Sequence, residues 1–307
     1  MQVNDNVRMK HFGNFIALLI LAINALFTGL LLLVAYSPYI QPVAHPVQSC
    51  FGLTFPIFAL INGAFLIFWL VIQRYKTALL PLIGFLLCYS QLRTYLPLNF
   101  HTANPPEESI KFLSYNIMGF NGAGKKDGKN PILTYLKESN ADILCLQEYA
   151  SDESPRRLTQ KDIERELKDY PYHRISVVGS GSGYTNKIAC YSKFPILSAR
   201  VLNYPSGYNG SVLYELKLNE DTITLINNHL ESNKLTKADK DIYEDILKAP
   251  EKEKVKSGAR LLVHKLAEAS AIRAPQADTI AREISSSRYP SVIVCGDFND
   301  TPISYAH

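Results

Sequence analysis

The sequence has few cysteines, and their spacing matches no common metal site. Five cysteines are spread over 307 residues, none in a CxxC pair and none with a histidine at the spacing of a zinc ligand. Neither a zinc site nor a disulfide framework is therefore indicated. Cys145 and Cys295 fall inside apolar runs, where a small buried thiol is the simplest interpretation. The chain also lacks an internal repeat and a low-complexity tract.

Residues 101–307 lack a net charge. They hold 27 of the 32 basic residues and 27 of the 28 acidic ones, so the formal charge of +4 belongs to the first 100 residues. A polyanion bound by the second part of the chain would not be attracted by bulk positive charge.

The first 100 residues contain three long apolar runs. They predict three transmembrane helices at about residues 12–36, 51–73 and 78–98, each long enough for a hydrocarbon core of about 30 Å. The third run is the weakest, because Arg93 lies within it and Pro81 stands near its start. The first is too long for the apolar part of a signal peptide, and buried helices of a soluble protein are the other alternative.

Basic residues lie before the first run and between the second and third, at the ends that would face the same side of a membrane. Arg8 and Lys10 precede the first run, Arg74 and Lys76 separate the second from the third, and residues 37–50 carry no charge. Since cytoplasmic loops collect Lys and Arg, we expect a cytoplasmic N-terminus in a bacterial inner membrane. Three crossings then place the rest of the chain outside the cytoplasm. If the third run does not cross, that part is cytoplasmic instead.

The rest of the chain reads as a linker and one catalytic domain. Residues 101–108 are polar and rich in proline, and residues 109–307 alternate strand-like and helix-like runs. The predicted strands are 110–117, 142–147, 187–192, 211–218, 222–227 and 291–295. The predicted helices are 131–139, 162–168, 236–247 and 251–284, the last of which the pattern allows to be divided.

Polar side chains follow several of these strands where each leaves the apolar core. Asn116, Glu148 and His229 each end one strand, and Asp297 and Asn299 follow the last one. Each residue alone has an ordinary structural interpretation, such as a turn residue or a solvated strand end. Together they indicate an active site, because a rigid sheet edge holds polar groups with the precision that catalysis needs.

These residues stand in short motifs that resemble the endonuclease/exonuclease/phosphatase superfamily, which has the DNase I-like fold. The matching pieces are Ser-Tyr-Asn116, Leu-Gln-Glu148, Asn227-Asn-His229-Leu, Gly296-Asp-Phe-Asn299-Asp, Ser192-Lys-Phe-Pro-Ile196 and Arg273-Ala-Pro-Gln276-Ala. The resemblance implies an α/β (α+β) four-layer sandwich of two mixed β-sheets flanked by helices. It also implies hydrolysis of phosphodiesters or phosphomonoesters with Mg²⁺, or alternatively with Mn²⁺.

The resemblance also suggests a role for each residue. Glu148 and Asn116 would hold the metal, since Mg²⁺ prefers oxygen ligands and keeps several waters. Asp297 and Asn299 would orient the attacking water and the phosphate. His229 would donate hydrogen bonds or a proton to a phosphate oxygen.

One departure from the superfamily concerns the end of the sequence. Members continue to a Ser-Asp-His motif that supplies the base, whereas this sequence stops at His307. We therefore expect an incomplete catalytic domain with an unpaired sheet edge. The alternative function is that of an inactive truncated remnant that acts as a membrane-tethered binding module.

The expected partners are a lipid bilayer and a phosphoester substrate, with no protein partner inferred. The shared catalytic residues do not distinguish a nucleic acid from a phospholipid headgroup. The absence of net charge mildly disfavours nucleic acid, and the membrane tether mildly favours a lipid.

Overall fold

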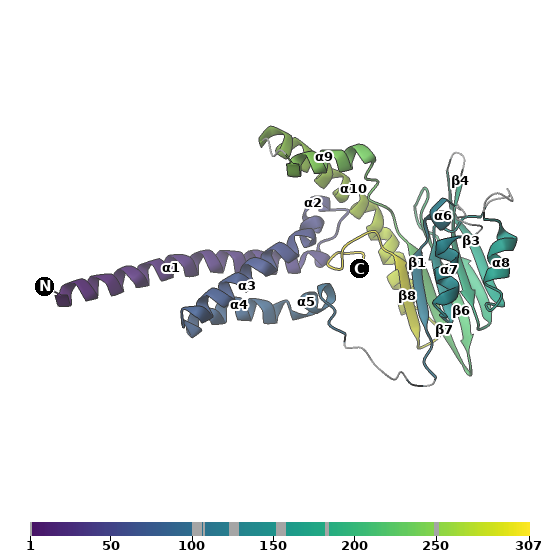
Figure 1. Cartoon of the computed structure of the whole chain (residues 1–307), viewed down its shortest axis with the longest axis horizontal. Coiled ribbons are helices and arrows are strands. Elements are labelled where there is room, and N and C mark those ends of the chain that lie inside the picture. The colour runs from purple at the N-terminus through teal and green to yellow at the C-terminus, as the bar shows by residue number, and fades with distance from the viewer. Residues whose placement is uncertain are drawn as a thin grey trace.

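The computed structural model describes residues 2–99, 106, 108–122, 129–151, 158–181, 184–248 and 252–307, with the backbone alone for 2–11 and for some positions in α9 and α10. Long helices extend from one side of a β-sandwich (Figure 1). The predicted linker at 101–108 lies mostly outside the described residues, so the domain boundaries stay a prediction.

The N-terminal helices run back and forth beside one another. Helix α1 (Gln2–Ala35) is followed by a connector of short helical turns, η1 (Ser37–Tyr39), α2 (Pro46–Ser49) and η2 (Cys50–Thr54). Helices α3 (Phe55–Val71), α4 (Tyr75–Leu87) and α5 (Tyr89–Tyr95) complete this part. The Tyr36 hydroxyl donates to the Leu87 carbonyl at 2.9 Å, so the C-terminal ends of α1 and α4 lie together.

Two helices in the described part of the chain are long and apolar enough to cross a membrane. They cover Phe12–Ala35 and Pro46–Val71. The prediction of a single third helix over 78–98 is wrong, because α4 ends at Leu87 and α5 starts at Tyr89. The 13 residues of α4 rise only about 20 Å, less than the hydrocarbon core.

The sandwich consists of two mixed four-stranded sheets with the orders β1-β2-β4-β3 and β5-β6-β7-β8. In the first sheet, β1 (Phe112–Asn116) and β2 (Ile143–Gln147) are parallel, and β4 (Tyr184–Ser192) and β3 (Tyr172–Gly181) are antiparallel to their neighbours. In the second, β5 (Ile196–Val201), β6 (Gly210–Leu218) and β7 (Asp221–His229) are antiparallel, and β8 (Val292–Asp297) is parallel to β7.

Apolar side chains fill three spaces between four layers. Between the sheets, Ile143, Ile188 and Tyr214 belong to one buried cluster. Helices α7 (Pro131–Glu138) and α8 (Gln160–Glu166) cover the first sheet through a second cluster. The long helix α10 (Lys252–Ser285) covers the other sheet through a third, which includes Ile280. The predicted arrangement of two mixed sheets flanked by helices is confirmed.

The sequence prediction missed two strands. Residues of β5 are mostly solvent-exposed because it is an edge strand, so it shows no apolar run. Strand β3 is also at an edge and ends in a glycine-rich stretch. The predicted helical region near the C-terminus consists of α9 (Lys237–Lys248) and α10, with residues 249–251 outside the described part.

Candidate active site

The ends of four strands meet at one edge of the sandwich. Asn116 is paired in register with Gln147 across β1 and β2, and His229 with Asp297 across β7 and β8. Carboxyl ends of parallel neighbours lie at the same sheet edge. The residues predicted to follow these strands are therefore brought together from both sheets.

Asn116 connects the two carboxylates of the site. Its Nδ2 donates to Glu148 Oε1 at 2.9 Å and to Asp297 Oδ2 at 3.0 Å. Its Oδ1 accepts from the backbone N–H of Met118 at 3.1 Å, which fixes the orientation of the amide. Because Glu148 belongs to one sheet and Asp297 to the other, this side chain links the sheets at the site.

His229 is almost fully buried beside Glu148. Its Nε2 lies 3.6 Å from Glu148 Oε1, and Asn186 Nδ2 lies 3.1 Å from its Nδ1. The same Asn186 amide donates to the Tyr208 carbonyl at 3.1 Å, so its NH₂ group faces the ring and the proton of the neutral imidazole sits on Nε2. Burial lowers the pKa of His229, and the negative charge of Glu148 opposes that shift.

Asp297, the last residue of β8, and Asn299 are held in a tight turn. The backbone N–H of Asn299 donates to Asp297 Oδ1 at 2.9 Å, and the Asn299 side chain donates to the Leu230 carbonyl at 2.9 Å. Asn116, Glu148, His229 and Asp297 thus form one cluster. Asn299 instead uses its amide nitrogen to anchor the turn to the end of β7.

Two residues in the site have left-handed backbone conformations. Glu148 has φ 51° and Asn299 has φ 52°, although neither is glycine. Such conformations cost of the order of 1–3 kcal/mol and concentrate at functional sites, where surrounding contacts enforce them. For Glu148 the enforcing contacts include a 2.8 Å hydrogen bond from Gly119 N–H to its carbonyl.

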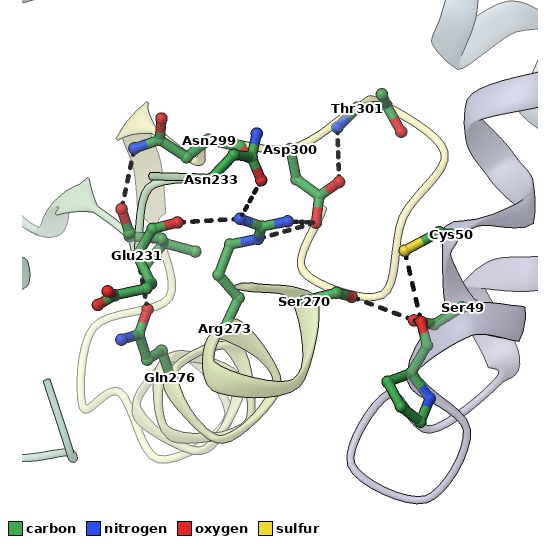
Figure 2. Close-up of polar contacts among 12 residues, drawn as sticks. Ser49, Cys50, Glu231, Asn233, Ser270, Arg273, Gln276, Asn299, Asp300 and Thr301 are labelled. Carbon is green, nitrogen blue, oxygen red and sulfur yellow. Dashed lines mark hydrogen bonds and ion pairs between the residues drawn. The ribbon is translucent and has the colours of Figure 1, made fainter. Parts of the chain in front are cut away.

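Arg273 of α10 organises the loops behind the turn, and the sequence did not single it out as a site residue. It is 2% exposed. Its guanidinium donates to Asp300 Oδ2, Asn233 Oδ1 and the Glu231 carbonyl, each at 2.9 Å. Figure 2 shows it between these groups. Its place in the Arg-Ala-Pro-Gln276 motif was the available signal.

A polar network between the sheets was also not predicted. Gln147 donates to Asn227 Oδ1 at 2.6 Å and to Ser114 Oγ at 3.2 Å. These buried amides join β1, β2 and β7 just below the site, and only the packing of one sheet on the other brings them together.

A pocket of about 600 Å³ adjoins the cluster. Asn116, Asp297 and Asn299 line it from the sandwich side, and Ser49 and Leu53 of the connector line it from the helical side.

The oxygen atoms of the cluster suit a divalent cation. Among the residues that the structure describes, no three His, Cys, Asp or Glu side chains form a metal cluster. Mg²⁺ does not require one, because it commonly uses one or two carboxylates together with water. Glu148 and Asp297 both lie within hydrogen-bond distance of one Asn116 nitrogen, a position where positive charge is favoured. The donor set therefore fits Mg²⁺ or Mn²⁺.

Three solved structures are similar to part of this chain. Staphylococcus aureus beta toxin (275-280) is 18% identical with a TM-score of 0.41, over 62% of this chain and 66% of that one. Humanized D. rerio TDP2 is 14% identical with a TM-score of 0.38, over 63% and 64%. TDP2 from C. elegans is 20% identical with a TM-score of 0.37, over 62% and 48%. The chain thus spans about half to two thirds of their lengths.

The comparisons with protein families divide the chain in two. None of the curated proteins matches the sequence. Residues 17–95 match a domain of unknown function (DUF8431). Residues 113–307 match the endonuclease/exonuclease/phosphatase family. This match spans more than half of the sequence and includes every residue of the site cluster, and the chain accordingly belongs to the endonuclease/exonuclease/phosphatase family.

Proposed function

We propose that this chain is a phosphoester hydrolase that requires a divalent cation and is held at a membrane. The observation that carries the proposal is the convergence of Asn116, Glu148, His229 and Asp297 from four strands in a member of this family. The alternative, a binding module without turnover, lacks an observation of its own in the structure.

Each side chain of the cluster has a defined task. Glu148 and Asn116 would hold the cation, Mg²⁺ or Mn²⁺: Glu148 through its carboxylate, and Asn116 through Oδ1, because its Nδ2 donates to the two carboxylates. When bound, the cation would polarise the phosphoryl oxygen and stabilise the leaving oxygen. Asp297 accepts a hydrogen bond from the attacking water and aligns it with phosphorus. The turn fixed by Asn299 keeps that carboxylate in place.

His229 contributes as a hydrogen-bond donor. Its Nε2–H points toward the cluster and donates to a non-bridging or leaving oxygen as negative charge develops there. Burial lowers the pKa of His229 and so favours the neutral imidazole, which donates without adding charge beside the cation. Asn186 holds the tautomer through Nδ1.

The distribution of side chains in the N-terminal helices supports the membrane location. Leu60 and Val71 are 76% and 74% exposed, whereas Asn24 and Asn62 are fully buried. Most residues of the two apolar segments are not buried, unlike those of the core helix of a soluble protein. The exterior of the helices is apolar and hydrogen bonds lie inside, such as that from Thr28 Oγ1 to Asn62 Oδ1 at 2.8 Å. This arrangement suits a lipid environment.

We further propose that the connector and the sandwich lie on one side of that membrane. The connector contacts α10 through Ser49 and Ser270, so both face the same compartment. Helices α4 and α5 together lead the chain back to the connector end of α3. There the ring of Tyr95, at the end of α5, lies 5.9 Å from the ring of Phe55, at the start of α3. The charge pattern then makes the N-terminus cytoplasmic. The bacterial inner membrane remains a prediction.

Substitution of the two carboxylates tests the proposed chemistry. In the full chain in detergent, Glu148→Gln and Asp297→Asn are each expected to lower Mg²⁺-dependent hydrolysis of bis(p-nitrophenyl) phosphate by about 100-fold or more, as for loss of a catalytic electrostatic contact. Glu138→Gln, an exposed carboxylate on α7, is the control. Calorimetry with Mn²⁺ is expected to show weaker binding for Glu148→Gln.

Two results would contradict this function. One is wild-type hydrolysis that EDTA does not affect, and the other is full turnover in Asp297→Asn. Binding of Mn²⁺ without hydrolysis of any phosphoester would favour the binding module instead.

A further inference from the structure

The connector between α1 and α3 forms one wall of the candidate active site. From this placement, and resting on the proposed function, we infer that the substrate is a phospholipid whose headgroup phosphoester is cleaved at the membrane surface. The two apolar helices that the connector joins would set the depth from which the substrate enters.

The connector docks directly on α10. Ser49 Oγ and Ser270 Oγ are 3.2 Å apart, and both side chains are buried. Gly52 lies so close to the segment after the site that a Cβ atom there would be 2.0 Å from the Ile303 carbonyl oxygen. Ile303 in turn packs with Leu31 and Phe55 from the ends of the two apolar helices. The contact is therefore close and involves both backbone and side chains.

The docked connector is continuous with the catalytic loops. Ser270 lies one helical turn before Arg273, whose ion pair with Asp300 fixes the segment that follows Asp297 and Asn299. Figure 2 shows two contacts of α10: Ser270 with Ser49 of the connector, and Arg273 with Asp300 of the segment after β8. The site is thereby held at a fixed height relative to the ends of α1 and α3.

With α1 and α3 in the membrane as proposed, this height would correspond to the headgroup layer. Ile303, which lines the pocket, packs with Leu31 near the C-terminal end of α1 and with Phe55 at the start of α3, where the apolar helices end. Leu53, 40% exposed, presents an apolar side chain to the pocket beside the polar catalytic groups. A pocket wall that is polar on one side and apolar on the other fits a phospholipid, whose headgroup is polar and whose acyl chains are apolar.

The same wall disfavours a polynucleotide. Single strands bind in open basic grooves with aromatic stacking surfaces. Tyr115 and Phe298 do line the pocket, but its lining arginine, Arg273, is neutralised by Asp300, and the connector bounds the helical side.

A basic face of α10 lies next to the connector. Lys256, Arg260 and His264, each one turn from the next, are exposed and share a surface groove with Val47 of α2. Lys and Arg residues beside a membrane are attracted to anionic lipid headgroups. This face would attract anionic headgroups to the side on which the pocket lies.

Surface dilution kinetics test the inference with the wild-type full chain in mixed micelles. The substrates are a phosphatidylglycerol, its deacylated soluble glycerophosphodiester, bis(p-nitrophenyl) phosphate and a single-stranded oligonucleotide, all with Mg²⁺. We expect lipid hydrolysis to follow the mole fraction of phospholipid in the micelle at constant bulk concentration. We also expect the intact lipid to be hydrolysed at least about tenfold faster than the deacylated ester, because binding of the non-reacting part contributes to catalysis.

A variant of the connector tests whether this segment causes the preference for the intact lipid. Leu53→Asp is expected to lower the ratio of lipid to soluble-ester hydrolysis by about tenfold, since it places a charge where the acyl region enters. Val43→Asp, 61% exposed on the same connector and outside the pocket lining, should change neither rate.

Each contrary result has a distinct meaning. Faster cleavage of the oligonucleotide or of the deacylated ester than of the lipid would overturn the lipid substrate while leaving the hydrolase intact. An unchanged ratio in Leu53→Asp would overturn the role of the connector. Failure to hydrolyse any of the four esters would overturn the proposed function and, with it, this inference.

Discussion

Arg273 carries a positive charge where almost no solvent reaches it. Its contribution to the stability of the protein therefore depends on the groups around it. Removing one partner of a buried ion pair typically costs about 3–5 kcal/mol, because the other charge stays buried alone. Arg273→Met is therefore expected to lower the free energy of unfolding by about that amount, since Asp300 would lose its cation. Urea titration of the full chain in detergent, monitored by fluorescence, measures this.

The matched control for Arg273 is on the same helix. Arg282→Met removes an exposed guanidinium that donates a hydrogen bond to Thr279, so it should change stability by less than about 0.5 kcal/mol. Equal losses in the two variants would mean that Arg273 acts only through helix propensity.

Gly296 precedes the candidate catalytic Asp297 and leaves no room for a side chain. Its φ is +133°, and a Cβ atom would lie 2.0 Å from the Asn228 carbonyl oxygen. We expect Gly296→Ala to destabilise the protein by about 3 kcal/mol and to displace Asp297. Gly207→Ala is the control, because a Cβ atom added there would meet no described atom within 4 Å and its φ is not positive. Thermal unfolding of both variants compares them.

At the scale of the elements, the start of α9 depends on one carboxylate. Asp239 accepts from Lys265 Nζ of α10 at 2.6 Å and from Thr236 backbone N–H at 2.7 Å. These contacts lower the pKa of Asp239 to about 2. The hydrogen bond from Lys265 has the largest effect, and the hydrogen bonds from Thr236 come next. The carboxylate thus caps one helix and ties it to the next.

The pH dependence of α9 follows from this shift. Because the folded pKa is below the unfolded value of about 3.9, the stabilisation is complete above pH of about 4 and is lost as the pH falls toward about 2. Over that window the α9 amides should lose protection, measured as their hydrogen-exchange rate relative to the intrinsic rate at each pH. Asp239→Asn should remove the pH dependence, and Lys265→Met should shift it to higher pH. An unchanged profile in Asp239→Asn would refute this capping role.

At the scale of the whole molecule, the packing of the connector on α10 predicts the topology. Val43 and Gln73 are both exposed and lie in the turns at opposite ends of the apolar helices. A short tag inserted at Val43 should be reached from the compartment that contains the catalytic domain, and a tag at Gln73 from the cytoplasm. Protease protection in intact and opened cells measures this. Access to both tags from the same side would contradict the proposed topology.

Much of the sandwich was predictable because its central strands are covered on both faces. β2 is buried at all five positions and therefore reads as a continuous apolar run. The edge strand β5 has no such run, and nothing local distinguishes it from a loop. The break at Cys88 within the third apolar run also has no strong local signal, since neither glycine nor proline stands there.

By itself the sequence determined the family, the apolar helices and the residues that end each strand, because periodicity, run length and short motifs are local properties. It placed Asn116, Glu148, His229 and Asp297 at strand ends but could not show that one amide would join two carboxylates from different sheets. Only the tertiary structure decided that Asn299 anchors a turn, that Arg273 is buried in an ion pair and that the connector borders the pocket. The physical reason is that each of these contacts joins residues far apart in the chain, and burial alone sets their charge and hydrogen-bond partners.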